Sequence, residues 1–171
     1  MKTTLLIFIL SIFCHCISAQ KSQEKSASNG VKYTITRFDS SKNTVISNKN
    51  NKLYKDKWIA PKKLTDNDIF SAIRLDKETA KTTQDLIFKA FTNAGKPIPQ
   101  ENIFAGFYIN ADGKILGIDF FSRASSKLTL NDINLVETTL INKFAFKTEP
   151  ERLKEMPVIK FIWRITLVKR N

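Results

Sequence analysis

The residues that most often form cross-links or bind transition metals, Cys14, His15 and Cys16, all lie within the first nineteen positions of the chain. That segment reads MKTTLLIFILSIFCHCISA, and its order of a positive start, an apolar run and small residues predicts a secretory signal cleaved after Ala19. A retained membrane anchor is the alternative, but the apolar run is shorter than the roughly 20 residues that a spanning helix needs. We therefore expect an exported protein, periplasmic or secreted, with no stable membrane span.

Loss of this segment leaves a mature chain without Cys or His. Such a chain forms no disulfide, offers no thiolate or imidazole to a metal, and has neither a Cys nucleophile nor a His-based catalytic pair. A domain of about 150 residues buries roughly 68–70% of its unfolded surface, so a hydrophobic core alone holds it. The length of 171 residues favours one domain, and the 42% hydrophobic content is that of a globular protein.

The first part of the mature chain is polar. We expect residues 20–30 to form a flexible tail and residues 31–38 to form a first strand. The Asn-rich and Ser-rich stretch 39–51 is typical of turns. A second short strand is expected over residues 53–60, where Pro61 ends it. The single domain therefore begins at residue 31 in this interpretation.

Two helix patterns come next. A Thr cap at Thr65 predicts a helix start, with Ile69, Phe70 and Ile73 facing inward. Apolar residues at helical spacing predict a strong helix over residues 77–93. Gly95 follows this helix, where a left-handed C-terminal cap is wanted.

The rest of the chain reads as a hairpin, a helix and a strand. Residues 103–110 and 114–121 flank an Asn-Ala-Asp-Gly turn and predict the hairpin. Residues 131–144 predict a second helix. Residues 147–156 form a charged connection. Residues 158–168 alternate strictly and predict a long final strand with one core-facing side, made of Ile159, Phe161, Trp163, Ile165 and Leu167.

The segments FYINADGKILGIDFFSRAS, NDINLVETTLINK, FAFKTEP and VIKFIWRITLV occur in this order. The order of helix, hairpin, helix and strand over about residues 77–168 resembles the C-terminal domain of TonB. The resemblance implies an α+β fold, with an antiparallel sheet of about three to five strands and two main helices on one face. It also implies a style of binding in which a partner pairs with the sheet edge. The TonB membrane anchor is replaced here by the expected cleavable signal, and the five prolines of the chain form no spacer.

The favoured function is therefore a non-enzymatic binding domain of the cell envelope. In a TonB-like sheet the last strand tends toward an edge, which offers unpaired amides and carbonyls to an envelope protein or to a second copy of the chain. We expect the partner-binding residues to be those on the polar side of this strand: Lys160, Ile162, Arg164 and Thr166.

Several apolar side chains fall on the strand face away from the expected core: Phe104, Tyr108, Phe121 and Ile162. Either the segment 31–60 covers them, or they form an exposed patch for a ligand or partner. We favour the first interpretation.

A second hypothesis is binding of an anionic envelope polymer. The chain carries 28 Lys and Arg against 16 Asp and Glu, for a net charge of +12. Such an excess attracts polyanions. The lysines are scattered, however, apart from the small groups 49–57 and 62–63, and scattered lysines usually form a solvated surface. Export argues against intracellular nucleic acid as the ligand.

A third hypothesis is a small hydrolase that uses two carboxylates across a cleft. Asp66 and Asp68 are read more simply as helix-cap residues, and Asp112 as a turn residue. Asp119 sits in mid-strand on the side away from Ile118 and Phe120, which we expect to be the wetter face. No phosphate-binding glycine motif and no calcium loop occurs, so we expect no catalytic residues, metal or cofactor.

Overall fold

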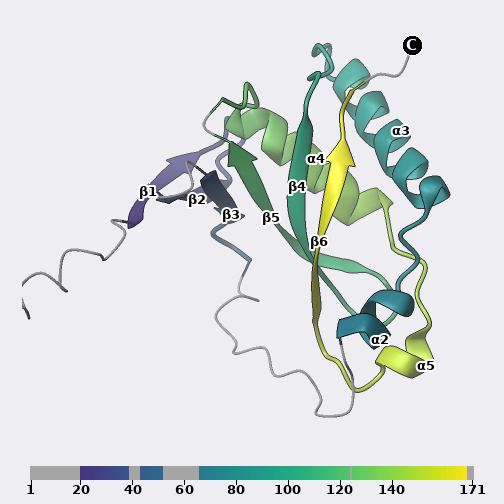
Figure 1. The fold of residues 1–171 in the computed structure, drawn as a ribbon. Helices are drawn as coiled ribbons and strands as arrows, with labels where there is room; N and C mark the ends of the chain where they lie inside the picture. The colour runs from purple at the N-terminus through teal and green to yellow at the C-terminus, as the bar shows by residue number, and fades with distance from the viewer. Residues whose placement is uncertain (1–19, 39–42, 52–65, 124, 169–171) are drawn as a thin grey trace, which may run out of the picture.

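The computed structural model describes residues 20–38, 43–51, 66–123 and 125–168. These residues form one antiparallel sheet of six strands in the order β1-β2-β3-β5-β4-β6. The long helices α3 and α4 lie on one side of it (Figure 1). We call the side under the helices the inner face and the opposite side the outer face. The predicted α+β class is confirmed, with six strands in place of the expected three to five.

The expectation of a flexible tail over residues 20–30 is wrong. Residues Gln20–Ser26 form strand β1, which pairs with β2, Lys32–Phe38. The turn between them is closed by bonds from the amide of Ala27 to the carbonyl of Val31 and from the amide of Gly30 to the carbonyl of Ala27. Gly30 has a φ of 83°, as a three-residue hairpin loop requires. Because β1 is an exposed, polar edge strand, it lacks the apolar alternation that marks a strand.

Strand β3, Asn43–Asn48, lies inside the stretch 39–51 that was expected to be turns. It joins β2 to β5, and its Ile46 is buried against the core. The three N-terminal strands therefore extend the sheet rather than cover its outer face. The strand expected over residues 53–60 lies outside the described residues.

Helix α2 covers Asp66–Ser71. Ile69 and Ile73 are buried as expected, but Phe70 is 46% exposed, so its predicted inward orientation is wrong. Thr65, the expected cap, lies outside the described residues.

Helix α3 spans Lys77–Asn93, as predicted, and its cap is the side chain of Asp76. Gly95 follows with a φ of 63°. Helix α4 spans Leu130–Lys143, one residue off at each end, and begins with a capping box between Thr129 and Asp132. The stretch expected to be a charged connection contains the short helix α5, Pro150–Leu153.

The predicted hairpin is β4, Asn102–Ile109, and β5, Ile115–Arg123. Its turn needs Gly113, which has a φ of 79° and packs so closely that an added Cβ would lie 1.9 Å from the carbonyl oxygen of Phe146. The last strand is β6, Ile159–Thr166. Its predicted inner side is confirmed, and Phe161 packs there on Phe107 and Phe146. The remaining inner-side residues of this strand pack in the same core: Ile159, Trp163, Ile165 and Leu167.

Candidate functional site

Strand β6 is an edge strand, because β4 is its one neighbour in the described sheet. The orientation of its backbone follows from the register. The register places Leu167 opposite Glu101, and the Leu167 amide donates to the Glu101 carbonyl at 3.0 Å. Because hydrogen-bonded pairs alternate along an antiparallel ladder, the odd-numbered residues of β6 are the ones bonded to β4. The amides and carbonyls of the even-numbered residues therefore point away from the sheet.

These even-numbered residues include the four that the sequence predicted as partner-binding. Lys160, Ile162 and Arg164 are exposed, Ile162 by 55%, and Thr166 is half-buried. The outward backbone groups of the first three have no hydrogen-bond partner in the described part of the chain. The geometry thus groups Lys160, Ile162 and Arg164 on one open stretch of edge.

Thr166 differs from the other three because helix α3 closes its end of the strand. Nε2 of Gln84 donates to the carbonyl oxygen of Thr166 at 3.1 Å and to that of Val168 at 3.0 Å. A side-chain donor thus takes the place that a pairing strand would occupy. The open stretch of the edge therefore ends at Arg164, a limit that the sequence pattern did not reveal.

Lys160 is held on the outer face rather than left free. Its Nζ lies 4.0 Å from Oδ2 of Asp119 and 4.9 Å from the ring centroid of Tyr108. The Tyr108 hydroxyl donates to the same Asp119 oxygen at 2.6 Å. Asp119 does lie on the outer face, but the expectation of a wet environment is wrong, since it is 5% exposed. Among the described groups, its Oδ1 is buried without a hydrogen-bond partner.

The apolar residues on the outer face are only partly covered. Tyr108 is buried, whereas Phe104 is 45% exposed and Ile162 is 55% exposed. The expectation that the N-terminal segment covers them is therefore wrong for Phe104 and Ile162. The ring of Phe121 lies against Gly106, where an added Cβ would meet Cε2 at 3.2 Å. A side chain at position 106 would therefore crowd the Phe121 ring.

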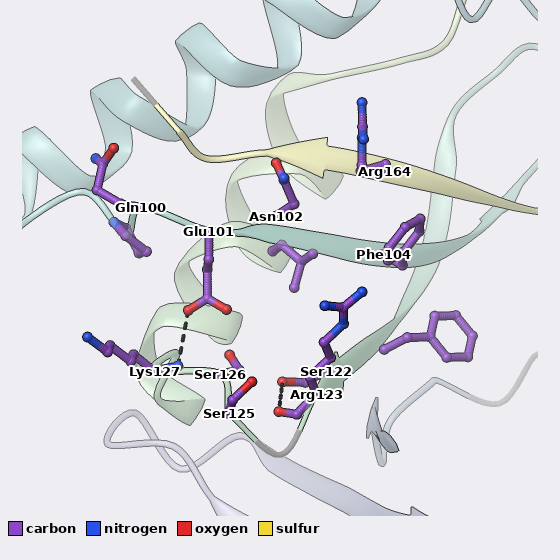
Figure 2. A pocket seen from close by; sticks show the side chains of 13 residues that line it. Gln100, Glu101, Asn102, Phe104, Ser122, Arg123, Ser125, Ser126, Lys127 and Arg164 are labelled. Atoms are coloured by element: carbon purple, nitrogen blue, oxygen red, sulfur yellow. Dashed lines mark hydrogen bonds between the residues drawn. The ribbon is translucent and has the colours of Figure 1, made fainter. Parts of the chain in front are cut away.

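A groove of about 670 Å³ opens beside Phe104 and Phe121, at the ends of β4, β5 and β6 (Figure 2). Two exposed guanidinium groups line it, those of Arg123 and Arg164, and neither forms an ion pair with another described residue. Glu101 is turned toward the loop, where its Oε1 accepts from the amide of Lys127 at 3.1 Å. Lys127 also belongs to the lining, so three cationic side chains surround one acid and the groove carries a net positive field.

A buried polar network between the inner face of the sheet and helix α4 was not predicted. The hydroxyl of Tyr33 donates to Oε2 of Glu137, and Asn48 Nδ2 donates to the same oxygen at 3.1 Å. Asn134 Nδ2 donates to the Tyr33 hydroxyl at 2.9 Å. Burial raises the pKa of Glu137 above its ordinary value, against the lowering effect of its two hydrogen bonds. Burial and the nearby Glu137 likewise raise the pKa of Tyr33.

The two buried carboxylates do not share a cleft. Glu137 lies on α4, on the inner side of the sheet. Asp119 lies on β5, and its side chain is on the outer face. Among the residues with a described placement, no group of Asp, Glu, Cys or His is arranged to hold a metal ion. None of the described helices is long and apolar enough to span a membrane.

Comparison with known proteins gives information about the fold only. One solved structure, that of a DUF5043 family protein from Bacteroides uniformis ATCC 8492, is similar with a TM-score of 0.60 and 18% sequence identity. The alignment covers 91% of this chain and 97% of that protein. No family model and no curated protein matches the sequence. The resemblance to the TonB C-terminal domain is not tested by these comparisons and stays a prediction.

Proposed function

We propose that this chain is an exported, non-enzymatic binding domain that takes up an extended segment of an envelope protein along β6. The observation that carries the proposal is the open stretch of edge from Lys160 to Arg164. Its outward amides and carbonyls are the groups that an added strand pairs with. Export is supported by the signal-like order of the first nineteen residues.

Side-chain placement adds to this support. A strand added about 4.8 Å from β6 has side chains directly opposite those of β6 on each face. An apolar residue of the partner opposite Ile162 would cover this exposed side chain. The partner segment is short, because Gln84 already occupies the carbonyls of Thr166 and Val168.

The opposite edge of the sheet is less suited to a partner. On β1 the exposed side chains are polar or charged, among them Lys21, Glu24 and Lys25. Charged side chains are the usual protection of an edge against pairing. Strand β6 also carries the charged Lys160 and Arg164, but it presents an exposed isoleucine between them. We therefore assign the partner to β6 and not to β1.

The test is a selection of random dodecapeptides, displayed on phage, on the immobilised mature protein. The key variant is Ile162→Pro, which removes an outward amide and leaves the bonds to β4 in place. The matched control is Ser22→Pro, because Ser22 also has an outward amide, on the β1 edge. We expect apolar sequences of high β propensity to be enriched on the parent and on Ser22→Pro, and not on Ile162→Pro.

Enrichment of the same peptides on Ile162→Pro, or no enrichment on the parent, would overturn the proposal. A second copy of the chain is the other possible occupant of the edge. Sedimentation at rising protein concentration detects it as a dimer that Ile162→Pro abolishes. That outcome would replace the envelope protein by a second copy.

A further inference from the structure

The groove at the ends of β4, β5 and β6 opens onto the outer face and the loop after β5, and it shares Arg164 with the pairing edge. The lining residues that matter for a ligand come from all three strands and the loop: Asn102, Phe104, Phe121, Arg123, Ser125 and Arg164. Its volume of about 670 Å³ lies in the range of small-molecule sites, about 300–1,000 Å³. The groove thus has room for a ligand the size of one or two sugar rings.

The charges of the groove select an anion. In Figure 2 the Arg123 side chain extends between Asn102 and Phe104, whereas Arg164 extends away from it on β6. A guanidinium presents a planar fork of donors that fits a carboxylate with two parallel hydrogen bonds. With no ion-pair partner among the described residues, the Arg123 fork is available for that purpose.

The remaining lining chemistry favours a ring with one apolar face and polar edges. Phe104 presents a half-exposed phenyl ring, and Phe121 is its direct neighbour across the β4–β5 pair. Asn102 and Ser125 supply an exposed amide and an exposed hydroxyl nearby. A sugar ring has C–H bonds on its faces and hydroxyls at its rim, so it matches both kinds of group.

We propose that this groove binds a uronic-acid residue of an anionic oligosaccharide. The carboxylate lies on Arg123, with Arg164 adding to the field. The C–H face of the ring lies on Phe104, and the ring hydroxyls meet Asn102 and Ser125. An inorganic anion satisfies the guanidinium alone, and a neutral sugar satisfies only the phenyl and hydroxyl partners. Binding therefore requires both features in one ligand.

The experiment is a titration of the mature protein followed by amide chemical shifts. The probes are a disaccharide containing one glucuronic acid, the same disaccharide with the acid reduced to the alcohol, and inorganic phosphate. The variants are Arg123→Gln and, as a matched control, Arg37→Gln, an exposed arginine on β2. We expect the acidic disaccharide to shift the amides of residues 102–104 and 121–127, and to bind about tenfold more weakly to Arg123→Gln than to the parent or the control.

Equal shifts with phosphate would overturn the sugar assignment, because they show that the groove responds to charge alone. Equal affinity for the reduced disaccharide, or an unchanged affinity of Arg123→Gln, would overturn the role of the guanidinium. The absence of any shift in these segments would overturn the site itself.

Discussion

The hydroxyl of Tyr33 on β2 donates a hydrogen bond of 2.6 Å to the buried Oε2 of Glu137 on α4. This bond joins the N-terminal part of the sheet to helix α4, which covers the inner face. Both side chains are almost fully covered, with 0% and 2% exposure. The attachment of strands β1–β3 to the rest of the domain therefore rests partly on a polar contact.

Tyr33→Phe removes this donor and leaves the carboxylate of Glu137 with one fewer hydrogen bond. We expect the free energy of unfolding to fall by about 1.5–3 kcal/mol, the usual range for a hydrogen bond to a charged group. Urea unfolding at neutral pH measures the loss. In a Glu137→Gln background the acceptor is neutral, so the same change should have a smaller effect. Equal losses in both backgrounds would show that the charge of Glu137 is not involved.

Glu137→Gln should reduce the loss of stability as pH rises. Burial raises the pKa of Glu137 in the folded state above its ordinary 4.5, so the unfolded chain loses this proton first as the pH increases. Stability from this group is thus full below about 4.5 and is lost as the pH rises through the folded pKa. Urea unfolding from pH 4 to pH 8 checks this, with the exposed Glu155→Gln as control. An unchanged pH profile in Glu137→Gln would contradict the assignment.

Gly113→Ala should destabilise the hairpin strongly. The residue has a positive φ, and an added Cβ would lie 1.9 Å from the carbonyl oxygen of Phe146. The matched control is Gly30→Ala, where φ is 83° and no atom lies within 4 Å of the added Cβ. The control should lose only the strain of a left-handed residue, about 1–2 kcal/mol, and Gly113→Ala should lose clearly more. Similar melting temperatures for the two variants would argue against the close contact.

Gln84→Ala should open the far end of the β6 edge. It removes the donor to the carbonyls of Thr166 and Val168, at a loss of about 0.5–1.5 kcal/mol per bond. Hydrogen exchange of the Leu167 amide, which bonds to Glu101, should become faster as this end loosens. Unchanged exchange at Leu167 would indicate that Gln84 does not hold this end of the strand.

The elements that the sequence predicted well are those with strong local signals. Helix 77–93 has regular apolar spacing, and the 103–121 hairpin has a turn glycine between two apolar runs. Strand β1 was missed because its side chains are polar, and β3 because its pairing with β5 joins segments far apart in the chain. Distant contacts also hold the turn between β1 and β2. Ser28, for example, donates from its amide to Asn131 Oδ1, a contact across 103 positions that no local pattern contains.

The candidate site was predicted in part for the same reason. The alternation in residues 158–168 identifies which side chains of β6 face outward, and the four predicted residues do so. The sequence cannot show that Gln84 closes the edge at Thr166 or that Asp119 holds Lys160, since both contacts join distant segments. The groove at Arg123 and Phe104 likewise depends on the pairing of β4 with β5 and β6.

The most direct test of the central claim is residue-resolved amide hydrogen exchange along β6, in the protein alone and with an excess of a peptide enriched in the selection. In the protein alone, the amides of Phe161, Trp163 and Ile165, which face β4, should be protected, whereas those of Lys160, Ile162 and Arg164 should exchange rapidly. The peptide should then protect these three outward amides. Uniform protection along β6 in the protein alone, or a bound peptide that leaves the outward amides unprotected, would contradict the account.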